Sequence, residues 1–164
     1  MATNINPEQL KECLNKNNIN FYEMGIDHGT ITAKIEEKKF EITSLRKDVS
    51  TDGRHAKVQF SDNWREDASR RDFTFNSIYA DLEGNLFDPF DGNKDLKNGY
   101  IKFIGDPDKR IKEDYLRILR YLRFFANYSK NDHDLKIKKI IRQNILGIKK
   151  ISSERLLDEL KKIV

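Results

Sequence analysis

The chain has 164 residues, of which 31 are Lys or Arg and 27 are Asp or Glu, so its formal net charge is +4. This length predicts about one domain with a modest hydrophobic core, and the mildly basic charge suits a phosphate-bearing partner without requiring one. No apolar run is long enough to span a bilayer and the N-terminal residues lack the pattern of a signal peptide, which argues against a membrane protein and predicts a cytoplasmic one.

The first predicted element is a helix over residues 7–16. Leu10, Cys13 and Leu14 recur at helical spacing, and Pro7 suits a first helical turn. We expect Cys13 to be buried on the apolar face of this helix. Because the chain has no second cysteine, no internal disulfide can form, which favours a reducing compartment.

From residue 30 the hydrophobic period changes to two. The stretches 30–35 and 40–45, separated by a charged turn, predict a β-hairpin. Residues 46–57 are polar and show no apolar period, so we expect a mobile loop there, followed by a short strand at 58–60.

Ser61 or Asp62 is expected to cap a helix that leads into the segment SRRDFTFNSI at 69–78. A second hairpin follows, with strands at 77–82 and 86–88. The C-terminal part is predicted to be helical, with helices beginning at Glu113, at Asp132 and at Ser152 or Ser153. Sheet residues followed by helices predict the α+β class.

One predicted helix, over 113–123, carries a polar stripe of arginines. Steps of three place Asp114, Arg117, Arg120 and Arg123 on one side. The opposite, apolar face consists of Tyr115, Ile118, Leu119, Leu122, Phe125 and Ala126. Such a stripe is usually a solvated helix face, but arginine without lysine favours bidentate contact with phosphate or a base edge.

The segment RRDFTFN offers a second set of polar groups. Asp72 could cap the next helix, and Arg70 and Arg71 could be cations at the end of the preceding one. Alternatively, these arginines supply donors for phosphate, Asp72 supplies an acceptor for a ribose hydroxyl, and Asn76 offers both kinds of hydrogen bond. Together with the arginine stripe, these groups are suited to holding a nucleotide.

Four motifs, in order, resemble those of the class II tRNA nucleotidyltransferases, a family of CCA-adding enzymes and related bacterial poly(A) polymerases. They are RRDFTFN at 70–76, DPFDG at 88–92, GDPDKRIKEDYLRILRYLRF at 105–124 and ISSERLLDEL at 151–160. The resemblance implies a nucleotidyltransferase head with a small β-sheet over residues 1–104. It also implies the start of an all-helical neck over 105–164.

The resemblance also implies roles for the RRD segment and its surroundings. Arg70 and Arg71 would face the phosphates of the incoming nucleotide, and Asp72 with Asn76 would select its ribose. The stretch STDGRHA at 50–56 resembles the flexible loop of the family, and DPFDG resembles its hinge.

In the EDxxR segment, Asp114 and Arg117 match the pair that reads the base edge of CTP or ATP. Arg120 and Arg123 would support the triphosphate. The reaction implied is the addition of CMP and AMP to the 3′ end of tRNA or another RNA, and the motifs do not separate CCA addition from polyadenylation.

In the family, two Mg²⁺ ions are held by an Asp-x-Asp strand that precedes the residues ATN, whereas here MATN opens the chain. The catalytic residues are therefore expected to lie outside it, and the chain alone is expected to be inactive. Glu41 is the one candidate metal ligand, although a strand glutamate usually faces solvent. A complementing N-terminal fragment would make a split enzyme; the alternative is a non-catalytic nucleotide- or RNA-binding remnant.

Overall fold

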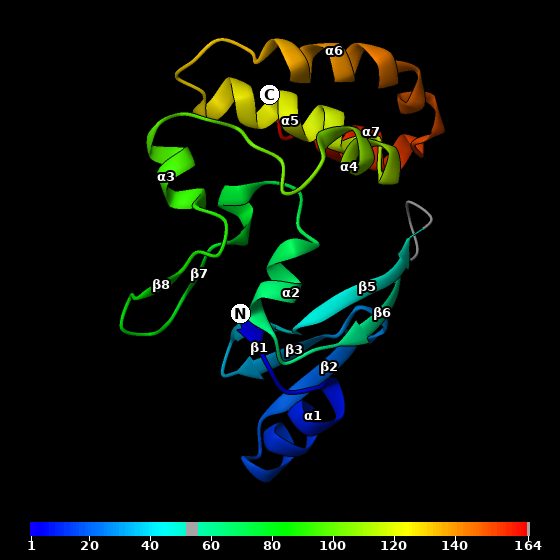
Figure 1. Cartoon of the computed structure of the whole chain (residues 1–164). Coiled ribbons are helices and arrows are strands. Elements are labelled where there is room, and N and C mark those ends of the chain that lie inside the picture. Colours follow the sequence, from blue (N-terminus) through cyan, green and yellow to red (C-terminus); the bar gives the residue numbers. More distant parts are fainter. Residues whose placement is uncertain (52–55, 164) are drawn as a thin grey trace. The chain divides into compact units, whose positions relative to one another are not determined.

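The computed structural model describes residues 1–51 and 56–163, which form two compact units (Figure 1). The first unit comprises residues 1–51 and 56–70, and the second comprises residues 71–163. Strands dominate the first unit and helices the second, which confirms the predicted α+β class. No helix within the described residues has the length and apolar character needed to cross a membrane.

The first unit is built on a four-stranded sheet. Its strand order is β1 (Ala2–Thr3), β4 (Lys38–Ser44), β3 (Thr30–Ile35) and β2 (Asn20–Gly25). The pair β3 and β4 is antiparallel and confirms the predicted hairpin, whereas β1 pairs with β4 in parallel. The short β1 and the strand β2 were not predicted, because neither shows an alternating pattern of apolar residues.

Helix α1 (Pro7–Lys16) covers this sheet and has the bounds that the sequence predicted. Leu10 and Leu14 pack on Ile31 and Ala33 of β3, and all four side chains are buried. Cys13 is exposed, so the prediction of a buried thiol was wrong. The buried face of α1 is narrow, and Cys13 lies outside it.

The prediction of a loop over 46–57 was also wrong. Strands β5 (Arg46–Thr51) and β6 (Ala56–Phe60) form an antiparallel pair, in which β6 includes the strand expected at 58–60. Backbone hydrogen bonds hold such a ribbon without an apolar face, so its polar sequence gave no strand signal. Residues 52–55 of the expected flexible loop lie outside the described part of the chain.

Helix α2 (Trp64–Ser69) ends the first unit. Its cap is Asn63, whose side-chain oxygen accepts hydrogen bonds from the backbone N–H groups of Arg65 at 2.9 Å and Glu66 at 3.3 Å. Neither Ser61 nor Asp62 takes this position, so the cap prediction missed the residue by one or two places.

The second unit begins with short elements. The 3₁₀ helix η2 (Thr74–Ser77) is followed by β7 (Tyr79–Ala80) and β8 (Leu86–Phe87), which pair as the predicted hairpin but with shorter strands. Helix α3 (Gly92–Lys97) was not predicted, because its six residues carry little apolar pattern.

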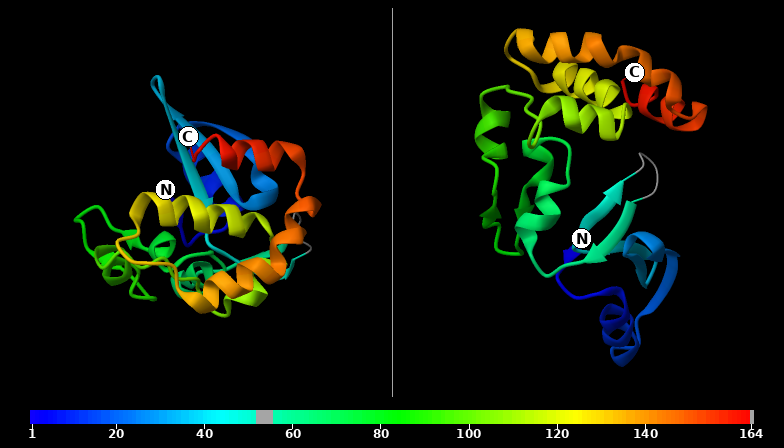
Figure 2. Two further views of the ribbon diagram at one scale, coloured as in Figure 1. Left: turned by 90° about the horizontal axis from the view of Figure 1, so that it is seen from above. Right: turned by 45° about the vertical axis from the view of Figure 1, so that its right-hand side comes forward.

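Helices α4 to α7 gather into one cluster in the rest of the second unit, as Figures 1 and 2 show. Their bounds, with those of the 3₁₀ helix η3, are Pro107–Glu113 (α4), Leu116–Tyr128 (α5), Leu135–Asn144 (α6), Ile145–Lys150 (η3) and Ser153–Leu160 (α7). A helix continuous from Glu113 was predicted, but Asp114 is extended and separates α4 from α5. Of the two predicted first residues, Ser152 takes the N-cap position of α7, although its side chain makes no capping hydrogen bond.

The core of the second unit is aromatic and aliphatic. Phe73, from the RRDFTFN segment, is fully buried and stacks at 5.8 Å on Phe75. The other buried members of this core are Ile101, Phe103, Ile111, Ile118, Tyr121 and Phe124. The predicted apolar face of α5 was partly wrong, because Tyr121 and Phe124 are buried whereas Leu122 is 40% exposed.

We predict that Ile118→Ala lowers the free energy of unfolding by ~2–5 kcal/mol, because Ile118 is fully buried and its loss leaves a cavity. Leu122→Ala, one turn away on an exposed site, should cost less than ~1 kcal/mol. Urea denaturation followed by circular dichroism measures both variants. Equal losses would contradict this description of the core.

Candidate functional site

The backbone around Asp72 is held by hydrogen bonds to the segment that contains Lys102 and Ile104. The N–H of Ile104 donates to the carbonyl of Asp72 at 2.9 Å, and the N–H of Thr74 donates to the carbonyl of Lys102 at 3.0 Å. With the buried ring of Phe73 between them, these two bonds hold residues 72–74 in one conformation.

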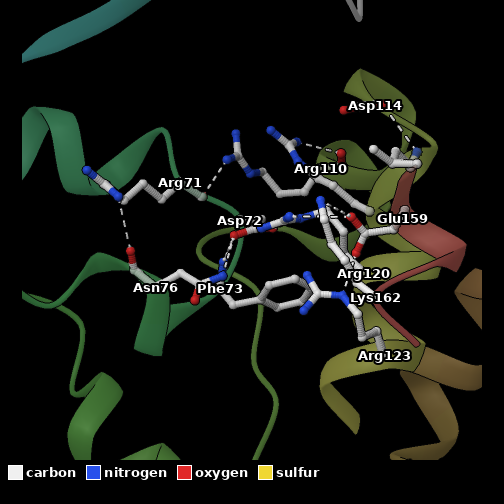
Figure 3. Close-up of polar contacts among 12 residues, drawn as sticks. Arg71, Asp72, Phe73, Asn76, Arg110, Asp114, Arg120, Arg123, Glu159 and Lys162 are labelled. Atoms are coloured by element: carbon white, nitrogen blue, oxygen red, sulfur yellow. Dashed lines mark hydrogen bonds and ion pairs between the residues drawn. The ribbon is translucent and has the colours of Figure 1, made fainter. Parts of the chain in front are cut away.

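The carboxylate of Asp72 is 8% exposed and accepts three hydrogen bonds (Figure 3). Its Oδ1 accepts from the N–H of Phe73 and from Asn76 Nδ2, both at 3.0 Å. Its Oδ2 accepts from Arg120 Nε at 2.5 Å. Burial alone raises the pKa of Asp72, but Arg120, Asn76 and the Phe73 N–H together outweigh it and lower the pKa below the ordinary value of 3.8.

Glu159 of α7 lies among basic side chains and is 2% exposed. Its Oε1 accepts from Arg123 Nε at 2.6 Å. Its Oε2 lies 3.9 Å from Arg120 Nη1 and 3.6 Å from Lys162 Nζ. A buried carboxylate requires cationic partners. Glu159 is accordingly surrounded by Arg120, Arg123 and Lys162 (Figure 3).

An aromatic ring supports two of these cations. The guanidinium carbons of Arg120 and Arg123 lie 5.4 Å and 4.1 Å from the centre of the Phe124 ring. Cation–π contact and the acidic partners together restrict both side chains. The arginine stripe of α5 is therefore an ordered, partly buried surface and not a freely solvated face, with side-chain exposures of 28% for Arg120 and 14% for Arg123.

Asp114 lies at the junction of α4 and α5 and is held from two sides. Its Oδ1 accepts from the N–H of Leu116 at 3.1 Å, and its Oδ2 accepts from Arg155 Nη2 at 2.6 Å. The carboxylate is 21% exposed and has lone pairs for further donors. Asp114 can therefore accept a hydrogen bond from an amino group that reaches this junction.

Arg117 is anchored beside it. Its Nη1 donates at 2.6 Å both to Glu113 Oε2 and to the carbonyl of Arg110. Arg110 also donates to Glu113 through Nη1 at 2.7 Å and to the carbonyl of Arg71 through Nη2 at 2.5 Å. Arg110 thus ties α4 to the segment that carries Asp72.

The two adjacent arginines of the RRD motif belong to different units. Arg71 donates through Nη1 to the carbonyl of Asn76 at 3.3 Å, and its guanidinium lies 5.2 Å from the Tyr79 ring centre. Arg70 belongs to the first unit, where its Nη2 and Nε donate to the buried Oδ1 of Asp67 at 2.7 Å and 3.0 Å. Asp67 thereby serves as an internal counter-ion for Arg70.

The structure places seven of the eight predicted site residues in the second unit, and Arg70 in the first. The seven are Arg71, Asp72, Asn76, Asp114, Arg117, Arg120 and Arg123. Three residues that tie them together were not singled out from the sequence, namely Arg110, Arg155 and Glu159. In the sequence, these three residues are distinguished only by their position within the motifs at 105–124 and 151–160.

Glu41, the candidate metal ligand, is exposed on β4 and faces Thr32 across the sheet. Within residues 1–51 and 56–163, no three His, Cys, Asp or Glu side chains are grouped closely enough to hold a metal ion. The described residues thus do not fit a two-magnesium site, which needs several hard oxygen ligands.

A family model, a curated protein and solved structures all relate this chain to the same group of enzymes. Residues 1–102 match the family described as the Poly A polymerase head domain. The chain is 48% identical over 166 residues to human mitochondrial CCA tRNA nucleotidyltransferase 1, in an alignment that covers 99% of this chain and 38% of that protein.

The solved structures with a similar fold include the following two. One is the Bacillus stearothermophilus CCA-adding enzyme in complex with CTP, with a TM-score of 0.83 and 30% identity over 99% of this chain and 38% of that one. The other is a tRNA nucleotidyltransferase complexed with a primer tRNA and an incoming ATP analog, with a TM-score of 0.73 and 30% identity over 98% of this chain and 45% of that one. The chain spans less than half the length of each relative.

We predict that Arg120→Gln raises the pKa of Asp72, because burial then acts without the charge that opposes it. In the wild type, the lowered pKa stabilises the folded state above pH ~3.8, and this stabilisation is lost as the pH falls through the folded-state pKa. Titration of the carboxyl carbon by NMR measures the shift.

Arg117→Gln is the matched control, because Arg117 pairs with Glu113 and should leave the titration of Asp72 unchanged. The same titration curve in Arg120→Gln and wild type would show that the ion pair does not set this pKa.

Proposed function

The chain belongs to the Poly A polymerase head-domain family, as its motifs predicted, and we propose that it is the nucleotide-recognising part of a tRNA nucleotidyltransferase. Such an enzyme adds CMP and AMP, taken from CTP and ATP, to the 3′ end of tRNA. The observation that carries the proposal is the bond from Arg120 to Asp72, which brings the RRD segment and the arginine stripe of α5 together.

The RRD segment is proposed to recognise the ribose. Asp72 is kept ionised by its lowered pKa and Asn76 is held beside it, so the pair offers an acceptor and a mixed donor and acceptor to the sugar hydroxyls. A ribonucleotide would then be preferred over a deoxyribonucleotide, because the missing hydroxyl leaves a polar group without its partner.

Asp114 and Arg117 are proposed to recognise the base. Cytosine and adenine each present an exocyclic amino group beside a ring nitrogen, which suits one acceptor and one donor. Asp114 retains acceptor capacity beyond its bonds to Leu116 and Arg155, and Arg117 has further N–H groups beyond the one bound to Glu113. Uracil and guanine present a carbonyl where these bases present the amine.

The phosphates are proposed to meet Arg71, Arg120 and Arg123. Arg120 and Arg123 make their shortest bonds to acidic partners through Nε, and Arg120 Nη1 lies at the longer distance of 3.9 Å from Glu159, so terminal N–H groups remain for phosphate oxygens. Arg70 was expected to share this role. Because Asp67 already holds its guanidinium, we propose that Arg70 contributes less to phosphate binding than Arg71 does.

Magnesium ligands are not provided by the described residues, and we assign no catalytic step to this chain. We propose that a complementing polypeptide with the Asp-x-Asp strand supplies them. Residues 1–104 are proposed as part of the catalytic head and residues 105–164 as the start of the neck. A cytoplasmic location is also proposed, although the human relative is a mitochondrial protein by name.

We predict that Arg117→Ala weakens CTP and ATP binding at least about tenfold, because a charged donor to the base edge is lost. Isothermal titration calorimetry with the full chain measures the affinity, and dCTP should bind the wild type more weakly than CTP. Arg142→Ala, on the exposed side of α6, is the control and should bind as the wild type does. Unchanged affinity in Arg117→Ala would refute the assignment of the base-reading pair.

We further predict that the chain incorporates labelled CMP or AMP into tRNA lacking its 3′ end only when mixed with a polypeptide that carries the Asp-x-Asp strand. Two magnesium ions are needed for in-line nucleotidyl transfer, and their ligands would come from that partner. Binding of CTP without incorporation in the mixture would favour a non-catalytic nucleotide-binding protein.

A further inference from the structure

Tyr115 lies between the two proposed base-reading residues in sequence, and its ring rests on the 3₁₀ helix η3. A methyl group built on Gly147 would lie 2.1 Å from Cδ1 and Cε1 of this ring and 2.5 Å from Cγ. Such distances are far below van der Waals contact, so the ring packs directly on the backbone of Gly147. Lys150 Nζ, also from η3, lies 5.6 Å from the ring centre.

The backbone of Gly147 has no positive φ, so its conformation does not require glycine. The close approach of Tyr115 is therefore the feature of this site that excludes a side chain. Gly147 and Lys150 together form a seat for the ring, and Ile148 packs against the same hydrophobic core as Tyr115.

The seat lies directly beside the junction that carries Asp114. Asp114 is extended, with φ −153° and ψ 107°, and Tyr115 turns into the helical region, with φ −64° and ψ −16°. The carbonyl of Asp114 accepts from the N–H of Arg117 at 3.1 Å, which starts α5. A displaced Tyr115 ring would shift this turn, and with it the carboxylate of Asp114.

We propose that Gly147 is a positioning residue for base selection, which it achieves by seating Tyr115 and so orienting Asp114. This rests on the proposed function, in which Asp114 reads the base edge. Gly147 itself needs no contact with the nucleotide. The Asp72 carboxylate accepts hydrogen bonds from Arg120, from the Phe73 N–H and from Asn76. The atoms nearest to Gly147 belong to Tyr115 and not to any of these donors, so ribose selection should not depend on Gly147.

The test is Gly147→Ala in the full chain, with Leu146→Ala as control because Leu146 is 71% exposed. The affinity ratio of CTP to UTP should fall about fivefold to tenfold in Gly147→Ala, as when one hydrogen bond is misaligned, while the ratio of CTP to dCTP stays unchanged. Leu146→Ala should keep both ratios. A uniform loss of affinity, with both ratios preserved, would overturn the proposal.

A second measurement needs no nucleotide. The N–H of Leu116 bonds to Asp114 and that of Phe73 bonds to Asp72. In Gly147→Ala, the amide resonance of Leu116 should shift in NMR spectra and that of Phe73 should not. An unshifted Leu116 amide would refute the positioning role, whereas absence of CTP binding to the wild type would refute the proposed function instead.

Should Gly147→Ala not fold, Tyr115→Leu removes the ring from the seat without adding an atom to η3. The same fall in the CTP to UTP ratio and the same shift of the Leu116 amide are expected. Retention of the ratio and of the amide position in this variant would overturn the proposal.

Discussion

The ion pair between Asp72 and Arg120 is the interaction on which the second unit depends. It joins residues 48 positions apart, and its carboxylate is almost fully buried. A buried carboxylate without a partner is strongly unfavourable, because the desolvation of the charge is then uncompensated. The RRDFTFN segment and α5 are therefore held in a single arrangement, and neither is expected to keep its geometry without the other.

The same pairing explains how so many arginines can be packed closely. Arg120 and Arg123 share the buried Glu159, while Arg110 and Arg117 share Glu113. Each carboxylate offsets the repulsion between two guanidinium groups and fixes their orientation. A guanidinium has five N–H donors, so the pairing of Arg120 and Arg123 with Glu159 does not use all the donors of these two side chains. Preorganised cations lose little conformational entropy when a phosphate binds.

Local signals predicted part of this fold, and the remainder depends on long-range contacts. Helix α1 and the hairpin of β3 and β4 follow from the periods of their apolar residues. The ribbon of β5 and β6 has no such period, and its backbone pairing cannot be inferred from its polar sequence. The break at Asp114 was missed because the sequence there suits a helix, whereas Arg155, 41 residues away, holds its carboxylate outside one.

Arg70 and Arg71 are neighbours in the RRDFTFN motif, but their side chains have different surroundings. Arg70 neutralises Asp67 inside the first unit. Arg71, the next residue, belongs to the second unit. Transplanting RRDFTFN into another scaffold would leave the first arginine without its counter-ion. The tolerance of each position to substitution would thus reflect unrelated demands, one on the folding of the first unit and one on the proposed binding of phosphate.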